Sequence, residues 1–179
     1  HIDGSIDALR DLESLEAELA FSDLAILERR VGKIHDTLKG AKGHEREVLQ
    51  KELSLLGDIK DHLEKDVPVR EQRLPDHAKL LISNYQFLTS KPLLILFNVD
   101  EAPNPDVIAL LSHVDIHDQR PGVKANALCT KLDMELSALS IDEEMAFRDS
   151  LTTSESGAVM LGKMAYDAMS MICYFTYGP

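Results

Sequence analysis

An unbroken apolar run, Leu93 to Phe97, constrains the fold of this chain more than any other feature. The run follows Pro92 and ends at the polar Asn98, so it has the length of a β-strand and falls far short of the roughly 20 residues of a membrane-spanning helix. A strand that is apolar on both faces is typical of the centre of a parallel sheet covered by helices. The run therefore predicts an α/β fold.

The pattern around this strand is one of alternating helices and strands, with a second strand predicted at Val123 to Cys129. Helices are expected at residues 76–89, 106–113, 132–139, 140–151 and 156–171, and a last strand-like run at residues 172–179. This order is that of βαβ units in a parallel sheet. Two strands are fewer than the five or six of a doubly wound domain, so the rest of the sheet is expected upstream of His1.

The first third of the chain predicts two long helices, at residues 7–39 and about 44–65. Each carries an apolar seam with steps of three and four: Leu24, Leu27, Val31, Ile34 and Leu38 in the first, and Leu49, Leu53, Leu56, Ile59 and Leu63 in the second. Gly40 and Gly43 supply a stop and a turn between them. A short turn between two seamed helices predicts an antiparallel, coiled-coil-like helical hairpin.

Composition narrows the class of protein. The formal net charge of -12 argues against binding nucleic acid through the overall field, because neutralising phosphates requires Lys and Arg. Cys129 and Cys173 lie far apart without a CxxC partner, which favours reduced thiols. Without a visible signal peptide or membrane segment, the chain is expected to be cytoplasmic and to bind no membrane.

Polar residues follow both predicted strands, where ligands of open α/β sheets bind. Asn98, Val99, Asp100 and Glu101 follow the first strand, and Cys129, Thr130 and Lys131 end or follow the second. A carboxamide offers a donor and an acceptor, and a carboxylate offers an acceptor pair, which are the groups that read a purine edge. From chemistry alone, ordinary turn and capping roles are the favoured interpretation of these residues, and a ligand site is the alternative.

The two motifs, N-V-D-E and C-T-K, resemble the N-K-x-D and S-A-K motifs that end neighbouring strands in P-loop GTPase domains. More specifically, the chain resembles the YchF family of Obg-like ATPases. The matching stretches are "HIDGSIDALRDLESLEAELAFSDLAILERR", "FLTSKPLLILFNVDE", "LDMELSALSIDEE" and "YFTYGP", in the family's order.

The resemblance implies a nucleotide site that binds ATP or GTP, with Mg²⁺ in the intact protein. Asn98 and Glu101 would form an N-x-x-E base motif, with Val99 in place of the usual Lys. Cys129, Thr130 and Lys131 would form the second base motif, in which Lys131 alone matches. Glu is one methylene longer than the Asp of a guanine reader, so the resemblance favours ATP over GTP.

The resemblance also implies a domain plan, that of a partial, Rossmann-like P-loop NTPase domain. Residues 1–13 and 67–172 would be the C-terminal half of the nucleotide-binding domain, and residues 14–66 an inserted helical hairpin. Residues 173–179 would begin the link to a TGS domain. No G-x-x-x-x-G-K-[ST] occurs in these 179 residues. The chain is therefore expected to be a fragment that does not hydrolyse nucleotide alone, while its intact parent is a slow, ribosome- or translation-associated NTPase.

A rival hypothesis is a non-enzymatic module that binds protein or RNA through the hairpin. Five cations gather around its tip, interleaved with acids: Lys33, Lys39, Lys42, Arg46 and Lys51. They fit either a solvated face or a contact to ribosomal or other RNA. In addition, a strand with an uncovered edge predicts self-association.

Three further groups of residues receive structural interpretations in preference to functional ones. His113, Asp115 and His117 alternate as metal ligands could, but the sequence offers no further ligand cluster nearby. Glu143 and Glu144 are interpreted as acids at a helix N-terminus. Four methionines are expected to form a core face on the last helix: Met160, Met164, Met169 and Met171.

Overall fold

The computed structural model describes residues 6–100, 109, 120–150 and 155–177. The chain forms two compact units, His1–Lys91 and Pro92–Pro179. The first unit is helical, and the second combines helices with a small parallel sheet. The predicted mixture of helices and parallel strands is thus confirmed. The finer division at residues 14–66 stays a prediction.

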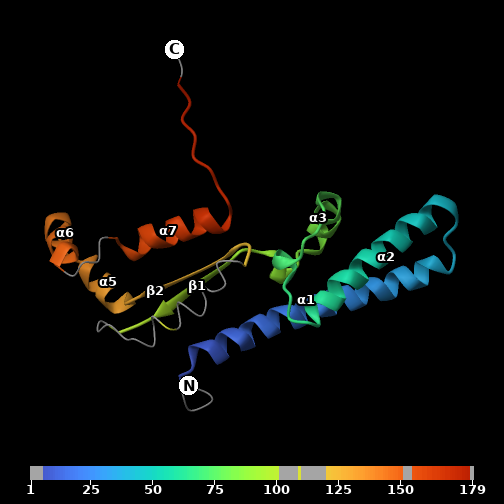
Figure 1. Cartoon of the computed structure of the whole chain (residues 1–179), viewed down its shortest axis with the longest axis horizontal. Helices are drawn as coiled ribbons and strands as arrows, with labels where there is room; N and C mark the ends of the chain where they lie inside the picture. The colour runs from blue at the N-terminus through green and yellow to red at the C-terminus, as the bar shows by residue number, and fades with distance from the viewer. Residues whose placement is uncertain (1–5, 101–108, 110–119, 151–154, 178–179) are drawn as a thin grey trace. The chain divides into compact units, whose positions relative to one another are not determined.

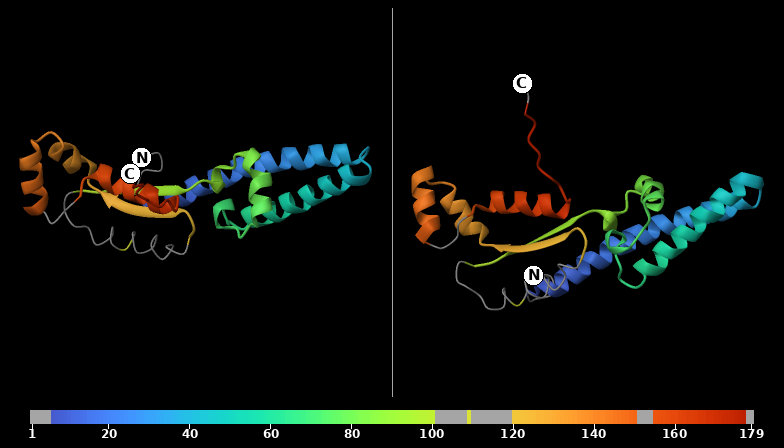
Figure 2. Two further views of the ribbon diagram at one scale, coloured as in Figure 1. Left: turned by 90° about the horizontal axis from the view of Figure 1, so that it is seen from above. Right: turned by 45° about the horizontal axis from the view of Figure 1, so that its top comes forward.

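The first unit is built on α1 (Ala8–Leu38) and α2 (Gly43–Leu63), which lie side by side and run in opposite directions (Figures 1 and 2). Arg30, in the second half of α1, pairs with Glu52, near the middle of α2. The turn reaches α2 through Gly43, whose positive φ of 54° suits a residue without a side chain. Both predicted helices are confirmed, with ends within two residues of those expected.

The interface between these helices is the apolar seam that the sequence predicts. The buried residues of this core are Leu27, Ile34, Leu56, Ile59, Leu63, Val69, Ile82 and Phe87. Burying each large aliphatic side chain stabilises the unit by about 1.5–3 kcal/mol relative to leaving it exposed. Leu24, Val31 and Leu38 are partly buried against the same core. Leu15, farther toward the N-terminus, is half exposed, so the apolar face of α1 extends beyond this core.

The segment after α2 returns to α1 through polar contacts. It contains η1 (Val69–Glu71), α3 (Asp76–Ile82), η2 (Ser83–Tyr85) and η3 (Leu88–Ser90). Asp23 of α1 is completely buried, and its two carboxylate oxygens accept hydrogen bonds of 2.8 Å from the N–H groups of Leu88 and Thr89. This contact fixes the segment against the hairpin.

The prediction of one helix over residues 76–89 is wrong, because α3 ends at Ile82. Gln86 adopts a left-handed conformation with φ 55°, which ends the helical path. The N–H groups of Leu88 and Thr89 donate to Asp23 and so are withdrawn from a continuing helix. The expected apolar face is also wrong, since Leu80 is 75% exposed while Ile82 and Phe87 are buried.

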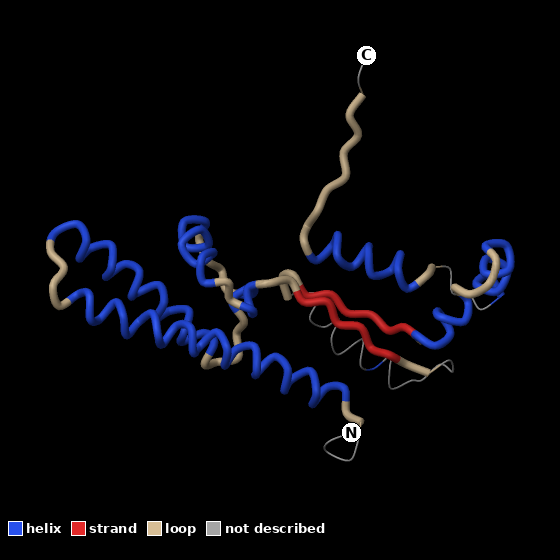
Figure 3. Tube along the Cα trace, turned by 180° about the vertical axis from the view of Figure 1, so that it is seen from behind, coloured by secondary structure: helices blue, strands red, loops and turns tan. Residues whose placement is uncertain are grey.

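The second unit centres on β1 (Leu93–Asn98) and β2 (Val123–Leu128), two parallel strands that lie side by side (Figure 3). Three helices follow β2: α5 (Thr130–Leu136), α6 (Ile141–Ser150) and α7 (Gly157–Ala168). Helix α7 packs along both strands (Figure 1). The predicted strands and these three helices are confirmed, and the helix expected at 106–113 lies outside the described residues.

Helix α7 covers the sheet with only part of the predicted methionine face. Met164 and Ala168 are buried, whereas Met169 and Met171 are 53% and 46% exposed. The helix ends at Ala168, and Ser170 has a left-handed φ of 51°, which turns the following residues off the helical face. The prediction of a face containing all four methionines is therefore wrong.

The last strand-like run is not a strand over residues 172–177. Phe175 is fully exposed, as is Tyr177. A strand needs a neighbour that pairs with its backbone N–H and C=O groups, and the described residues supply none to this segment. Its apolar, β-favouring composition alone misled the prediction.

Candidate functional site

The ends of β1 and β2 meet at one edge of the sheet. Asn98 is the register partner of Leu128, and Val99 N–H donates a 3.1 Å hydrogen bond to the Leu128 carbonyl. Because the two strands are parallel, the residues that follow each strand lie at the same edge of the sheet. Asn98 and Thr130, predicted to lie near one crevice, are indeed brought together there.

The contact between them is a pair of hydrogen bonds to one oxygen. Asn98 Oδ1 accepts from Thr130 N–H at 3.3 Å and from Thr130 Oγ1 at 2.7 Å. A backbone N–H can only donate, so the carbonyl side of the carboxamide must face Thr130. The Asn98 amino group consequently points away, and it donates no hydrogen bond within the described part of the chain. The strand end thus presents two N–H donors.

The other predicted base-site residues surround this pair along the chain. Lys131 is exposed in the first turn of α5, next to the exposed Thr130. Cys129 is a half-buried free thiol at the position that precedes α5, and Val99 is half-buried beside Leu128. Glu101 lies outside the described residues. The role of these residues in base binding stays a prediction.

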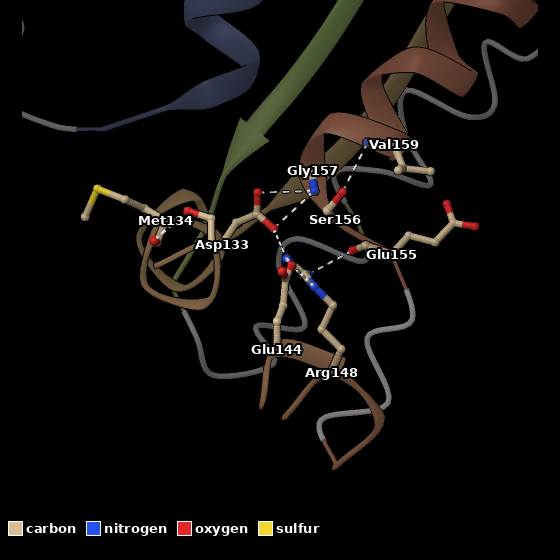
Figure 4. Close-up of polar contacts among 9 residues, drawn as sticks. Asp133, Met134, Glu144, Arg148, Glu155, Ser156, Gly157 and Val159 are labelled. Atoms are coloured by element: carbon tan, nitrogen blue, oxygen red, sulfur yellow. Dashed lines mark hydrogen bonds and ion pairs between the residues drawn. The ribbon is translucent and has the colours of Figure 1, made fainter. Parts of the chain in front are cut away.

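A polar cluster, which sequence reasoning missed, joins α5, α6 and α7 (Figure 4). Asp133 of α5 accepts from Arg148 Nη2 at 2.7 Å and from Gly157 N–H at 3.1 and 3.2 Å. Arg148 is 6% exposed and also donates to Glu144 and to the Glu155 carbonyl, at 2.9 and 3.0 Å. Burial acts to raise the pKa of Asp133, but the hydrogen bonds from Arg148 and Gly157 outweigh it and lower that pKa.

Glu143 and Glu144 lie in the first turn of α6, as their structural interpretation predicted, and each has a hydrogen-bonding partner. Glu143 accepts from the Ser140 N–H and hydroxyl, at 3.1 and 2.6 Å, a capping arrangement in which the Ser140 hydroxyl lowers the pKa of Glu143. Glu144 pairs with Arg148 one turn later. The Glu144–Arg148 spacing of four residues was the one signal in the sequence that could have pointed to the cluster.

A different site lies in the first unit, where Arg30 binds Glu52 in a bidentate pair with distances of 2.7 and 2.8 Å. The Tyr85 hydroxyl also donates to Glu52, and the Tyr85 ring stacks on Phe87 with centroids 5.4 Å apart. The Arg30 hydrogen bond lowers the pKa of Glu52, while burial raises the pKa of Tyr85. An open pocket beside the pair is lined by Ile26, Arg29, Arg30, Lys33 and Tyr85.

The cations predicted to gather at the hairpin tip are mostly exposed, as either interpretation requires. Lys39 pairs with Asp36 at 2.7 Å, and both side chains are 77% exposed. Arg46 donates to the Leu38 carbonyl at 3.2 Å, near the turn. These contacts favour a solvated face at the tip itself.

Within the described ranges, the structure contains neither a cluster of metal ligands nor a membrane-spanning helix. His113, Asp115 and His117 lie outside them, and within them no three His, Cys, Asp or Glu side chains gather as a metal would require. Across the same ranges, no helix has both the length and the apolar character needed to cross a membrane. Cys129 and Cys173 are free thiols, as predicted.

The fold and the strand-end site together define a class, an α/β protein with a candidate ligand site at the carboxyl edge of parallel strands and a separate unit that contains a helical hairpin. The solved structure of the Schizosaccharomyces pombe YchF GTPase shares this fold, with a TM-score of 0.81, 22% identity, and coverage of 99% of this chain and 48% of that chain. No family model matches the chain.

Curated sequences show the same resemblance. The chain is 28% identical over 180 residues to "Ribosome-binding ATPase YchF" of Bacillus subtilis and 30% identical over 181 residues to that of Haemophilus influenzae. Each match covers 99% of this chain and 48% of the relative, so the chain spans about half the length of the curated relatives it matches. The predicted resemblance to the YchF family is confirmed.

Proposed function

We propose that this chain supplies the base-binding and helical-hairpin portion of a YchF-type, Obg-like nucleotide-binding protein. ATP or GTP would lie against Asn98, Glu101 and Lys131, and the intact protein would hydrolyse it slowly as a translation-associated switch. The observation that carries the proposal is the double hydrogen bond from Thr130 to Asn98 Oδ1. It joins the two strand ends and sets the face that Asn98 offers to a ligand.

The oriented carboxamide favours a purine. With Oδ1 engaged by Thr130, Asn98 can offer N–H donors, and these match the N7 acceptor that adenine and guanine share. Asn98 would then select purines as a class without separating ATP from GTP. That choice is assigned to Glu101, whose extra methylene relative to Asp disturbs the bidentate fit to guanine.

Phosphate chemistry is assigned to residues beyond these 179. The sequence has no phosphate-binding G-x-x-x-x-G-K-[ST], and the described residues do not fit a Mg²⁺ site, since no three potential carboxylate or imidazole ligands gather in them. We therefore propose that the chain alone binds a base weakly and does not hydrolyse nucleotide. In the intact protein, residues 14–66 would form a hairpin inserted into the nucleotide domain.

Titration of the intact natural protein with fluorescent ATP and GTP analogues tests the base site. Asn98→Ala should weaken both nucleotides by about tenfold, the loss expected for one oriented hydrogen bond. Glu101→Asp should instead change the ratio of the two affinities toward GTP. Lys39→Ala, in the exposed Asp36 pair of the other unit, is the matched control. Unchanged affinity in both site variants would remove the site.

A second candidate function, RNA binding by the hairpin, is favoured by one observation. Arg29 and Lys33 lie one turn apart on α1, line the pocket beside Tyr85, and form no ion pair with any described residue. Like charges at this spacing disfavour a helix, so an anionic partner would relieve them. Cations beside an aromatic ring are typical of single-stranded RNA sites.

Fluorescence anisotropy with a labelled single-stranded RNA tests this second function. Arg29→Gln with Lys33→Gln should weaken binding and reduce the slope of log affinity against log salt by about 1.4, because about two fewer counterions are released. Lys39→Gln with Lys42→Gln removes the same charge at the tip and is the control. Equal losses of RNA affinity in the two double variants would show that the effect comes from net charge and not from this pocket.

A further inference from the structure

We infer that Asp133, Arg148 and Gly157 act together as positioning residues for the base site, fixing which face of the Asn98 carboxamide meets the ligand. We call these three residues the α5 anchor. The inference rests on the proposed function, because it concerns how that site selects its base. It differs from a purely structural role in predicting that the anchor governs recognition of one purine atom, N7.

The first step is the coupling between Asp133 and the strand end. Helix α5 begins at Thr130, immediately after the loop residue Cys129, and Asp133 N–H donates to the Cys129 carbonyl at 3.0 Å. Asp133 therefore lies one turn along the same short helix that carries the two Thr130 donors. Any shift of Asp133 shifts Thr130 with it, because a single helical turn has little freedom to deform.

The second step is that Asp133 is held from two other helices, as Figure 4 shows. Arg148 reaches it from α6, and the Gly157 N–H reaches it from the start of α7. Arg148 is nearly completely buried and is itself fixed by Glu144 and by the Glu155 carbonyl. Charge-assisted bonds of this kind are short and directional, so the anchor defines the position of α5 closely.

The third step is the close packing at Gly157. A Cβ atom at this position would lie 2.6 Å from Leu128 Cδ2 and 2.8 Å from Asp133 Oδ2. Leu128 ends β2 and is the register partner of Asn98. The start of α7 therefore contacts both the strand end and the anchor carboxylate, and a side chain at position 157 would force Leu128 or Asp133 to move.

The consequence falls on Asn98, because Thr130 determines which face of its carboxamide is presented to a ligand. Two Thr130 donors converge on Asn98 Oδ1, so a flipped carboxamide would set its own N–H groups against them. If the anchor is loosened, Thr130 withdraws and both carboxamide orientations become accessible. The flipped form presents a carbonyl oxygen to the ligand, which repels the purine N7 lone pair.

Nucleotides in which a C–H replaces N7 distinguish positioning from simple destabilisation. The intact natural protein should bind 7-deaza-ATP and 7-deaza-GTP about fivefold to tenfold more weakly than ATP and GTP. In Arg148→Met this penalty should fall below twofold, and in Arg148→Lys, which keeps one charged donor, it should be intermediate. Lys79→Met, which removes an exposed cation of the other unit, is the control and should keep the full penalty.

A folded Arg148→Met protein that keeps the full 7-deaza penalty would overturn the inference, whatever its overall affinity. If Arg148→Met does not fold, the same comparison is made with Arg148→Lys. If the wild-type protein binds nucleotide without a 7-deaza penalty, the inference fails; if it binds no nucleotide, the proposed function fails. Hydrogen–deuterium exchange of residues 128–134 in the nucleotide-free protein then decides on the anchor alone: faster exchange in Arg148→Lys supports positioning, and unchanged exchange refutes it.

Discussion

Replacing Arg30 by methionine should destabilise the hairpin unit more than any comparable change to an exposed ion pair. Arg30 makes two hydrogen bonds to Glu52, at 2.7 and 2.8 Å, and Glu52 retains only 10% exposure of its side chain. Methionine keeps the length and the apolar stem of arginine. The substitution therefore leaves the Glu52 carboxylate buried with Tyr85 as its remaining partner.

The magnitude follows from how much of the pair is shielded from water. Removing one partner of a fully buried pair costs about 3–5 kcal/mol, whereas exposed pairs contribute about 0–1 kcal/mol. The Arg30 side chain is 38% exposed, so solvent screening reduces the buried value, and we expect a loss of about 2 kcal/mol. For a unit of this size, that loss lowers the melting temperature by roughly 10 °C.

Thermal and urea unfolding, followed by far-UV circular dichroism, measure the effect because α1 and α2 dominate the helical signal of the first unit. Lys39→Met is the control: its partner Asp36 is as exposed as Lys39 itself, so the substitution should leave the unfolding transition essentially unchanged. If Arg30→Met costs no more than Lys39→Met, the argument from burial is refuted.

The same pair gives this prediction a pH dependence of known sign. The Arg30 hydrogen bond holds the pKa of Glu52 below its ordinary value of 4.5 in the folded state. The stabilisation is therefore complete above pH 4.5 and is lost as pH falls through the lowered folded value. The difference in stability between wild type and Arg30→Met should shrink over that acidic window and stay constant above it.

Three further predictions concern other contacts. Asp23→Ala should cost about 2–4 kcal/mol in urea unfolding, because it leaves the buried Thr89 N–H and the partly buried Leu88 N–H without their acceptor; Asn, which keeps one acceptor, should cost about half as much. Gly157→Ala should destabilise the second unit by about 1–3 kcal/mol through overpacking against Leu128, and equal stability would contradict the close approach. The isolated chain should self-associate through its two-stranded sheet, and light scattering that shows a monomer with intact helical dichroism would argue against it.

Local pattern was sufficient for most of the secondary structure. The steps of three and four in α1 and α2 predicted both helices, because each helix buries a continuous stripe against the other. Leu93 to Phe97 predicted β1 because an unbroken apolar run of this length is typical of a strand in a covered parallel sheet. Parallel strands end at one edge, so the proximity of Asn98 and Thr130 could be predicted too, but their hydrogen bonds could not. Those bonds depend on the position of α5, which distant residues determine.

The failures share this cause. Helix α3 ends early because residues 88 and 89 bond to a carboxylate 65 and 66 positions away, and no local pattern reports such a partner. Residues 172–177 have strand-like composition without a paired neighbour, and composition does not supply the neighbour. Asp133, Arg148 and Gly157 come from three helices, so only the fold shows that they meet.

Two buried acids could nevertheless have been identified from the sequence, because each lies on the apolar stripe of its helix. Asp23 precedes the buried Leu27 by four residues, and Glu52 precedes the buried Leu56 by four. Both carboxylates therefore lie on the stripe that faces the core, where an unpartnered charge would be costly. A charged residue in register with an apolar stripe thus predicts a compensating partner, although not its identity. Here the partners are backbone N–H groups in one case and Arg30 with Tyr85 in the other, and both bring the segment after α2 onto the hairpin.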